Sequence, residues 1–261
     1  MRVSAAPALA MSMLLFVPTL TPAAPAACTA QSGSVIPAVA ELYTSEGCDS
    51  CPPADRWMGA LKDQAARGKV VPLAFHTDYW DYLGWKDRFA DPAYGARHRE
   101  AASRGGASVI YTPQVLVDGR EFQQWRRTTP EQLAAARNAK PARADLRITA
   151  TQGAGQALQV SLTGRLAAGA SGAGAYLALY ENGLSSDVKA GENKGVVLHH
   201  DFVVRRWLGP FAFDAGTLAV SQAIELPADG VAARSGVAVV AVDGRGAILQ
   251  ALALPLRECG G

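Results

Sequence analysis

Residues 38–55 read AVAELYTSEGCDSCPPAD, and this stretch decides how the rest of the chain is interpreted. The apolar run at 38–44 predicts a buried strand, and the polar residues after it predict a turn. Residues 54–67 carry apolar side chains at helical spacing, which predicts a helix. Cys48 and Cys51 therefore form a C-x-x-C motif between the end of a strand and the start of a helix.

The position of the two cysteines has a chemical logic. A helix N-terminus presents unpaired N–H groups and a partial positive charge, and both stabilise a thiolate. We therefore expect Cys48 to be the accessible, more acidic thiol, and Cys51 to be shielded and to close a disulfide with it. Glu46 and Asp49 oppose this effect, because nearby negative charge disfavours a thiolate.

Two other interpretations of the motif stay open. It could be half of a zinc site, although the sequence offers no second C-x-x-C and no pair of histidines with the spacing of a zinc finger. It could also be a purely structural disulfide, although so short a loop constrains little of the chain.

The order of elements around the motif is typical of an α/β domain over residues 38–140. A second buried strand is predicted at 70–75, and the aromatic-rich stretch HTDYWDYLGWKDRF follows at 76–89. The remaining predicted elements are a helix at 92–103, strands at 114–117 and 121–125, and a helix at 131–138.

Beyond Pro141 the pattern changes to short runs of strand-forming residues separated by glycine clusters. Strand-like runs occur at 175–180, 196–204, 218–226, 237–242 and 247–254, and no helix is predicted. Several strands with turn signals between them are typical of a sandwich. We therefore expect residues 144–256 to form a β-sandwich-like domain that follows the α/β domain.

Three stretches resemble an exported, thioredoxin-like bacterial family, the domain-of-unknown-function 1223 family: residues 41–55, residues 75–85 (FHTDYWDYLGW) and residues 111–114 (YTPQ). The resemblance implies a thioredoxin-like fold with a helical, aromatic-rich insertion. It also implies that Cys48 attacks, that Cys51 resolves, and that Pro113 is a cis-proline facing the substrate. The backbone groups of Thr112 would then be free to pair with an extended substrate.

The first 26 residues have the features of a secretory signal peptide. Arg2 precedes an apolar stretch at 8–20, and Ala24-Pro25-Ala26 fits a cleavage site. We therefore expect a periplasmic or secreted protein with no stable membrane span after cleavage. The chain has 25 basic and 23 acidic residues, a balance that gives no electrostatic case for binding nucleic acid.

Export changes the interpretation of the remaining cysteines, because exported proteins form disulfides. Cys28 and Cys259 lie near opposite ends of the mature chain, and domain termini are often close in space. We expect a structural disulfide between them.

The histidines are few. His76 and Asp78 follow a predicted strand and are candidates for proton transfer during thiol exchange, and His76 could also join the two cysteines around a copper ion. We favour the interpretation that His76 is a structural residue whose ring nitrogens are hydrogen-bonded at the end of the strand. His199 and His200 are adjacent in a strand-like run and should point to opposite faces, so they should not share a metal. No metal ligand set and no cofactor is predicted.

These observations predict an exported thiol–disulfide oxidoreductase whose partners are the thiols or disulfides of other exported proteins. Two alternatives remain: a copper-handling or other metal-handling protein that uses Cys48, Cys51 and His76, and a redox-inert binding module. The direction of electron flow does not follow from the sequence.

Overall fold

The structure, a computed structural model, describes residue 1 and residues 27–106, 109–137, 140–153 and 157–259. The predicted signal peptide lies outside the described residues except for Met1. Within these described ranges, no helix is both long enough and apolar enough to cross a membrane.

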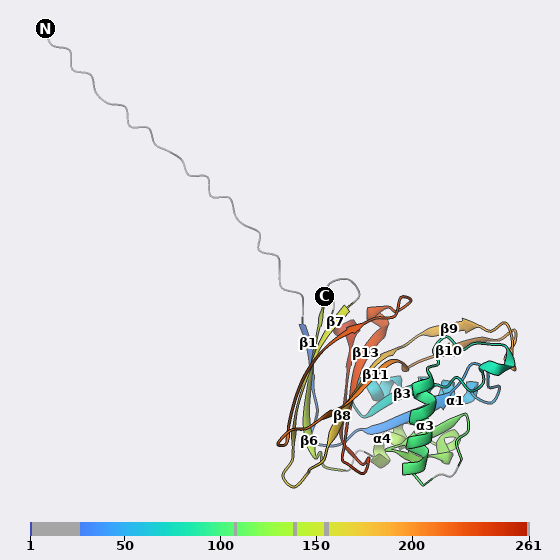
Figure 1. Cartoon of the computed structure of the whole chain (residues 1–261), viewed down its shortest axis with the longest axis horizontal. Coiled ribbons are helices and arrows are strands. Elements are labelled where there is room, and N and C mark those ends of the chain that lie inside the picture. Colours follow the sequence, from blue (N-terminus) through green and yellow to red (C-terminus); the bar gives the residue numbers. More distant parts are fainter. Residues whose placement is uncertain (2–26, 107–108, 138–139, 154–156, 260–261) are drawn as a thin grey trace.

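Short helices and many strands make up the chain (Figure 1). The helices are α1 (Pro52–Ala60), α2 (Lys62–Ala66), α3 (Pro92–Arg104) and α4 (Pro130–Arg137). The first strands are β1 (Ala27–Gln31), β2 (Ala38–Thr44), β3 (Val70–His76), β4 (Gln114–Val117), β5 (Arg120–Glu121), β6 (Ala144–Gln152) and β7 (Ala157–Leu166). The later strands are β8 (Gly174–Glu181), β9 (Leu184–Asp187), β10 (Val197–His200), β11 (Val203–Ala212), β12 (Thr217–Glu225), β13 (Ser235–Val242) and β14 (Ile248–Pro255).

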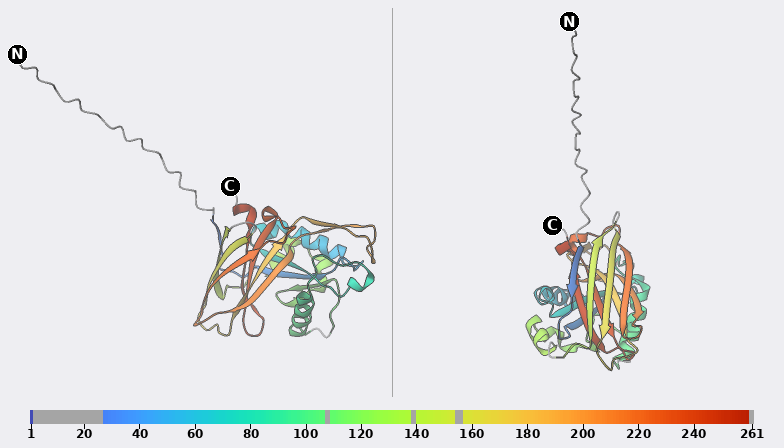
Figure 2. Two further views of the ribbon diagram at one scale, coloured as in Figure 1. Left: turned by 45° about the horizontal axis from the view of Figure 1, so that its top comes forward. Right: turned by 90° about the vertical axis from the view of Figure 1, so that its left-hand side faces the viewer.

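A mixed eight-stranded sheet with the order β14-β13-β8-β11-β3-β2-β4-β5 is the centre of the molecule. Its parallel strands β2 and β3 are buried at every residue, because α3 lies on one side of this part of the sheet and α1 and α4 lie on the other (Figure 2). On the α3 side, Tyr43 of β2 stacks on Phe75 of β3 and on His98 of α3, with ring centroids 5.4 and 4.0 Å apart.

A four-stranded antiparallel sheet with the order β1-β6-β7-β12 packs against the other end of the large sheet. Leu177 and Leu179 of β8 belong to the core between the two sheets, whereas Ala178 and Tyr180 of the same strand belong to the core beneath the helices. Successive side chains of a strand point to opposite faces, so β8 is covered on both sides. The same alternation holds for β13.

Strands from both predicted domains share the large sheet. The sequence assigns residues 38–140 and 144–256 to separate domains, but β8, β11, β13 and β14 continue the sheet that contains β2 and β3. The junction is the parallel pairing of β11 with β3, at Val203 and Ala74. The sheet-on-sheet packing expected for the second half is present, and one of its two sheets extends into the α/β half.

Three predicted elements differ in extent. The helix expected at 54–67 is divided into α1 and α2 at Leu61, and the strand expected at 121–125 is replaced after Glu121 by a 3₁₀ helix at Gln123–Arg127. The strand expected at 196–204 is interrupted at Phe202, whose φ of 57° turns the chain between β10 and β11. A pattern of apolar residues does not reveal such short interruptions.

Cys28 and Cys259 are joined as a disulfide in the structure. The bond ties β1, at the edge of the four-stranded sheet, to the short 3₁₀ helix Leu256–Cys259 at the end of the described chain. The two residues are 231 positions apart. Closing so long a loop removes much of the entropy of the unfolded chain, which corresponds to about 5 kcal/mol at most in the chain-entropy description.

A buried ion pair holds β8 beside β11. Glu181 is fully buried on β8, and its Oε2 lies 2.5 Å from Nη1 of Arg205 on β11, which is 8% exposed. Glu181 Oε1 also accepts a hydrogen bond from Val231 N at 3.1 Å and lies 3.3 Å from the half-exposed Arg234. Arg205 extends the pair outward to Asp229 on the surface.

We expect Arg205→Met to lower the free energy of unfolding by about 3 kcal/mol, because it leaves the Glu181 carboxylate buried without its main partner. Arg88→Met is the matched control, since Arg88 forms an exposed ion pair with the same Asp229. An exposed pair contributes less than about 1 kcal/mol. Urea denaturation of both variants measures the free energy of unfolding. Equal decreases in the two variants would show that the buried pair contributes no more to stability than the exposed pair.

Candidate functional site

The Cys48–Cys51 pair lies in the turn between β2 and α1. Cys51 is the residue that precedes the first turn of α1, and its backbone N–H donates to Cys48 O at 3.3 Å. The two cysteines are joined as a disulfide. Both residues are buried, with exposed fractions of 1% for Cys48 and 0% for Cys51. The expectation that Cys48 is accessible is therefore wrong for this oxidised state.

The connection between β9 and β10, residues 188–196, covers the cysteine turn; we call it the cover loop. The Asn193 side-chain amide donates to Glu46 O and to Cys48 O, both at 2.9 Å. Next to it, Glu192 Oε2 accepts the backbone N–H of Asp49 at 3.0 Å. These contacts join residues more than 140 positions apart, so no local pattern in the sequence could have indicated them.

Two tryptophans of the aromatic-rich segment also pack on the cysteine turn. A Cβ at Gly47 would lie 2.8 Å from the Cβ of Trp80, so the turn leaves room for no side chain at residue 47. The Trp80 indole N–H donates to Thr112 Oγ1 at 2.7 Å, and the Trp85 indole N–H donates to Glu46 Oε2 at 2.8 Å. These tryptophans therefore hold the aromatic-rich segment against the fold.

The Thr112–Pro113 peptide bond is cis, and both residues are buried. The hydrogen bond from Trp80 to Thr112, together with the packing of Trp80 on Gly47, connects the loop before β4 to the cysteine turn. The structure thus brings residues 112–113 to the same end of the sheet as the cysteine pair.

Beneath the turn lies a group of buried charged side chains. His76, at the end of β3, is fully buried, and its Nδ1 lies 2.7 Å from Asp87 Oδ2. Asp87 Oδ2 also accepts the backbone N–H of Glu46 at 2.9 Å. Burial opposes ionisation of Asp87, but the charge of His76 and these hydrogen bonds hold its pKa below the usual value.

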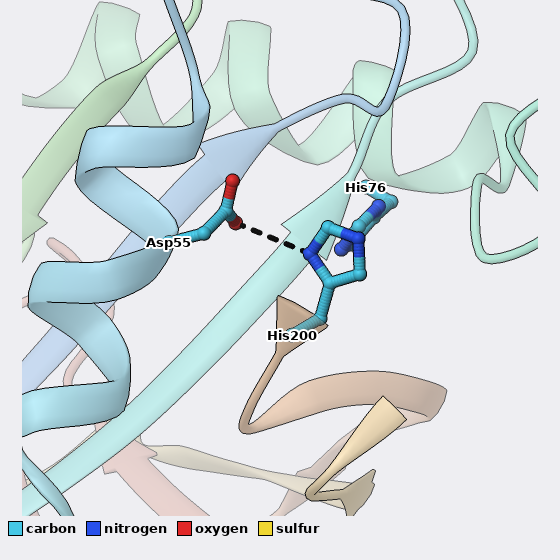
Figure 3. A group of neighbouring side chains, drawn as sticks. All are labelled: Asp55, His76 and His200. Carbon is cyan, nitrogen blue, oxygen red and sulfur yellow. Dashed lines mark ion pairs between the residues drawn. The ribbon is translucent and has the colours of Figure 1, made fainter. Parts of the chain in front are cut away.

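His200 approaches the same place from β10, and Asp55 approaches it from α1 (Figure 3). The His200 ring lies between two carboxylates, with Nε2 3.3 Å from Glu46 Oε1 and Nδ1 3.6 Å from Asp55 Oδ1. Burial lowers the pKa of His200, but Asp55 and Glu46 outweigh burial and raise it to about 10. Burial likewise opposes ionisation of Glu46, whose pKa His200 nevertheless keeps below its usual value.

The candidates for proton transfer have different surroundings. Among the described residues, His76 has no hydrogen bond to either cysteine; its partner is Asp87. Asp78 is half-buried and lies against α3, with Oδ1 3.4 Å from where a Cβ at Gly95 would be. His199 is exposed and His200 is buried, in line with the expectation that they point to opposite faces.

Sequence reasoning missed three members of this group. Asp55 stands four residues after Cys51 on α1, so helical spacing places it below the cysteine turn. The sequence alone could therefore have indicated that Asp55 belongs to this group. Asp87 lies in an irregular segment after the tryptophans, and His200 comes from the other half of the chain. No spacing rule relates either residue to the cysteines.

Comparison with solved structures found two similar chains. A protein of Agrobacterium tumefaciens, AGR_C_4864, is 26% identical and superposes with a TM-score of 0.55 over 85% of this chain and 96% of that chain. HBP35 of Porphyromonas gingivalis is 16% identical, with a TM-score of 0.64 over 87% of this chain and 77% of that chain, and this likeness concerns the fold alone. A comparison with curated proteins found no match.

The family comparison covers most of the sheet that carries the site. Residues 39–242 match a family described as "Protein of unknown function (DUF1223)". The matched range begins in β2 and ends with β13, so it includes the cysteine turn, the tryptophans, the cover loop and His200. The chain belongs to the DUF1223 family.

Proposed function

We propose that the Cys48–Cys51 disulfide is redox-active and exchanges with the thiols of other exported proteins, as in a thioredoxin-like oxidoreductase. The observation that carries the proposal is the position of the pair, closed as a disulfide in the turn between a buried parallel strand and a helix N-terminus. The position of the loop at Thr112 and Pro113, linked to this turn through Trp80, supports it.

The exchange follows from the disulfide in the structure. A substrate thiolate attacks Cys48 Sγ, the Cys48–Cys51 bond breaks, and Cys51 leaves as a thiolate. A second substrate thiolate then attacks the substrate sulfur of the mixed disulfide, and Cys48 leaves as a thiolate. The substrate gains a disulfide, and the protein keeps two thiols after proton uptake. The same steps in reverse reduce a substrate disulfide.

Exchange requires the cover loop to move, because both cysteines are buried beneath it in the oxidised state. The loop is attached to the turn mainly through polar contacts of Asn193 and Glu192. Hydrogen bonds of this kind contribute about 1 kcal/mol each. An opening of modest free energy is therefore compatible with exchange on a biochemical timescale.

The metal-handling alternative, with copper held by Cys48, Cys51 and His76, has less support. Both sulfurs are engaged in the disulfide, so neither is a thiolate ligand in this state. The redox-inert alternative is favoured by the burial of the pair and is separated from the proposal by the two experiments below.

Cys51→Ser should accumulate mixed disulfides through Cys48 when the protein is expressed with its signal peptide in a bacterium. The substitution removes the resolving thiol and keeps the attacking one. Non-reducing gels would show adducts that collapse with reductant. The matched control is the double variant that also carries Cys48→Ser, which should form none. Absence of Cys48-dependent adducts contradicts the proposal.

Asn193→Ala should accelerate reduction of the Cys48–Cys51 disulfide by dithiothreitol about tenfold or more, because two hydrogen bonds that close the loop are lost. Lys194→Ala is the control, since its side chain is exposed beside Asn193. The rate is measured by quenched alkylation and mass spectrometry. Equal rates for Asn193→Ala and the wild type would show that the cover loop does not limit access.

A further inference from the structure

The buried group beneath the cysteine turn contains polar atoms without hydrogen-bond partners. Of the eight such side-chain atoms found in the described part of the chain, four lie here: Glu46 Oε1, His76 Nε2 and both ring nitrogens of His200. Buried polar atoms are nearly always hydrogen-bonded, because leaving them unpaired is costly. Four such atoms in one place therefore indicate that a specific partner binds there.

Hydrogen bonds orient two of the side chains around this place, His76 and Asp55. His76 is oriented by Asp87 through Nδ1, at 2.7 Å, so Nε2 is its free atom. Asp55 Oδ2 accepts a hydrogen bond from Thr44 at 3.2 Å, and its Oδ1 faces His200. Asp55, His76 and His200 each offer one potential ligand atom, and these three atoms lie within 4.8 Å of one another (Figure 3).

The distances around His200 suit a metal site better than a network of hydrogen bonds. Its nitrogens lie 3.3 and 3.6 Å from the two carboxylates, and neither contact has the geometry of a hydrogen bond. A tetrahedral zinc ion with bonds of about 2.0–2.1 Å places neighbouring ligand atoms about 3.3–3.4 Å apart. The separation of Asp55 Oδ1 from His200 Nδ1 is close to this value.

The charge of the group points the same way. Glu46, Asp55 and Asp87 are 0%, 7% and 1% exposed, and the ion-pair partners found for them in the described chain are His76 and His200. Even with His200 protonated and the His76–Asp87 pair neutral, Glu46 and Asp55 leave one negative charge in excess. Burying carboxylates is costly unless positive charge is placed beside them, and a divalent ion held by two neutral imidazoles supplies the two positive charges that two protonated histidines would otherwise supply.

We propose that Asp55, His76 Nε2 and His200 Nδ1 bind a divalent first-row transition-metal ion, with Zn²⁺ as the ion that fits the site best. Glu46, whose Oε1 lies 3.3 Å from His200 Nε2, would then stand behind His200, as Asp87 stands behind His76. A carboxylate behind each metal-bound imidazole is the usual way in which proteins orient such ligands. Two imidazoles and one carboxylate suit zinc and leave a further position for water.

This site is separate from the cysteine chemistry and does not rest on the proposed function. Its ligands come from α1, β3 and β10, so the ion would tie the hairpin below the cover loop to the sheet and to the helix that follows the cysteines. No spacing of histidines along the sequence indicates it, because the ligands are more than 20 residues apart.

The test uses full-length exported protein stripped of metal and titrated with Zn²⁺ in competition with a chromophoric chelator. The wild type should bind one Zn²⁺ per chain. His76→Gln, His200→Gln and Asp55→Asn should each weaken binding more than about 100-fold, and Asp87→Asn should weaken it about 10- to 100-fold. His199→Gln, which alters the exposed neighbour, should bind as the wild type does.

Substitution with Co²⁺ keeps the proposal testable where a variant fails to fold. The wild type and the Cys48→Ser/Cys51→Ser variant should both give the visible bands of a low-coordinate Co²⁺ ion with nitrogen and oxygen ligands and no thiolate charge-transfer band. Lack of binding by the wild type, loss of binding in the cysteine variant, or wild-type affinity in folded His200→Gln would each overturn the proposal.

Discussion

The pairing of β11 with β3 is the constraint on which the site depends. The two strands are parallel, their register pairs Val203 with Ala74, and Ala74 N–H donates to Phe202 O at 2.8 Å. Because β3 ends at His76 and only two residues separate the end of β10 from the start of β11, this pairing sets His200 beside His76. The same hairpin carries the cover loop to the cysteine turn, so the second half of the chain completes a site that the first half begins.

The turn between β10 and β11, which places His200, contains a residue in an unfavourable backbone conformation. Phe202 has a φ of 57°, in the left-handed region that costs a residue with a side chain about 1–2 kcal/mol. Asn182 Oδ1 accepts the Phe202 N–H at 2.9 Å, and the Phe202 side chain is buried in the core beneath the helices. Packing and this hydrogen bond stabilise the sharp reversal that directs His200 inward and leaves His199 exposed.

Local physics made the first half of the site predictable. The strand at 38–44, the helix that begins after Cys51 and the strand that follows Pro113 could be derived from apolar patterning and from the chemistry of helix ends, and each is present. The mixed α/β class was predictable for the same reason. The DUF1223 resemblance, found in the same motifs, is shown by the family match.

The rest depended on contacts between distant residues. Strands β8 and β13 are buried on both faces, and a run such as SGVAVVAV looks the same whether a sheet or a helix covers its second face. Patterning therefore predicted a sandwich but not its continuation into the α/β sheet. Likewise, the cover of Cys48 by Asn193 depends on the β3–β11 register, which no single segment encodes.

The most direct test of the account compares the two disulfides in one sample. Folded protein is equilibrated in glutathione buffers of graded potential, alkylated and analysed by mass spectrometry, so that Cys48–Cys51 and Cys28–Cys259 are followed separately. We expect Cys48–Cys51 to be reduced and reoxidised reversibly while Cys28–Cys259 stays closed. If Cys48–Cys51 stays closed until the protein unfolds, or opens only together with Cys28–Cys259, the pair is structural and the proposed exchange does not occur.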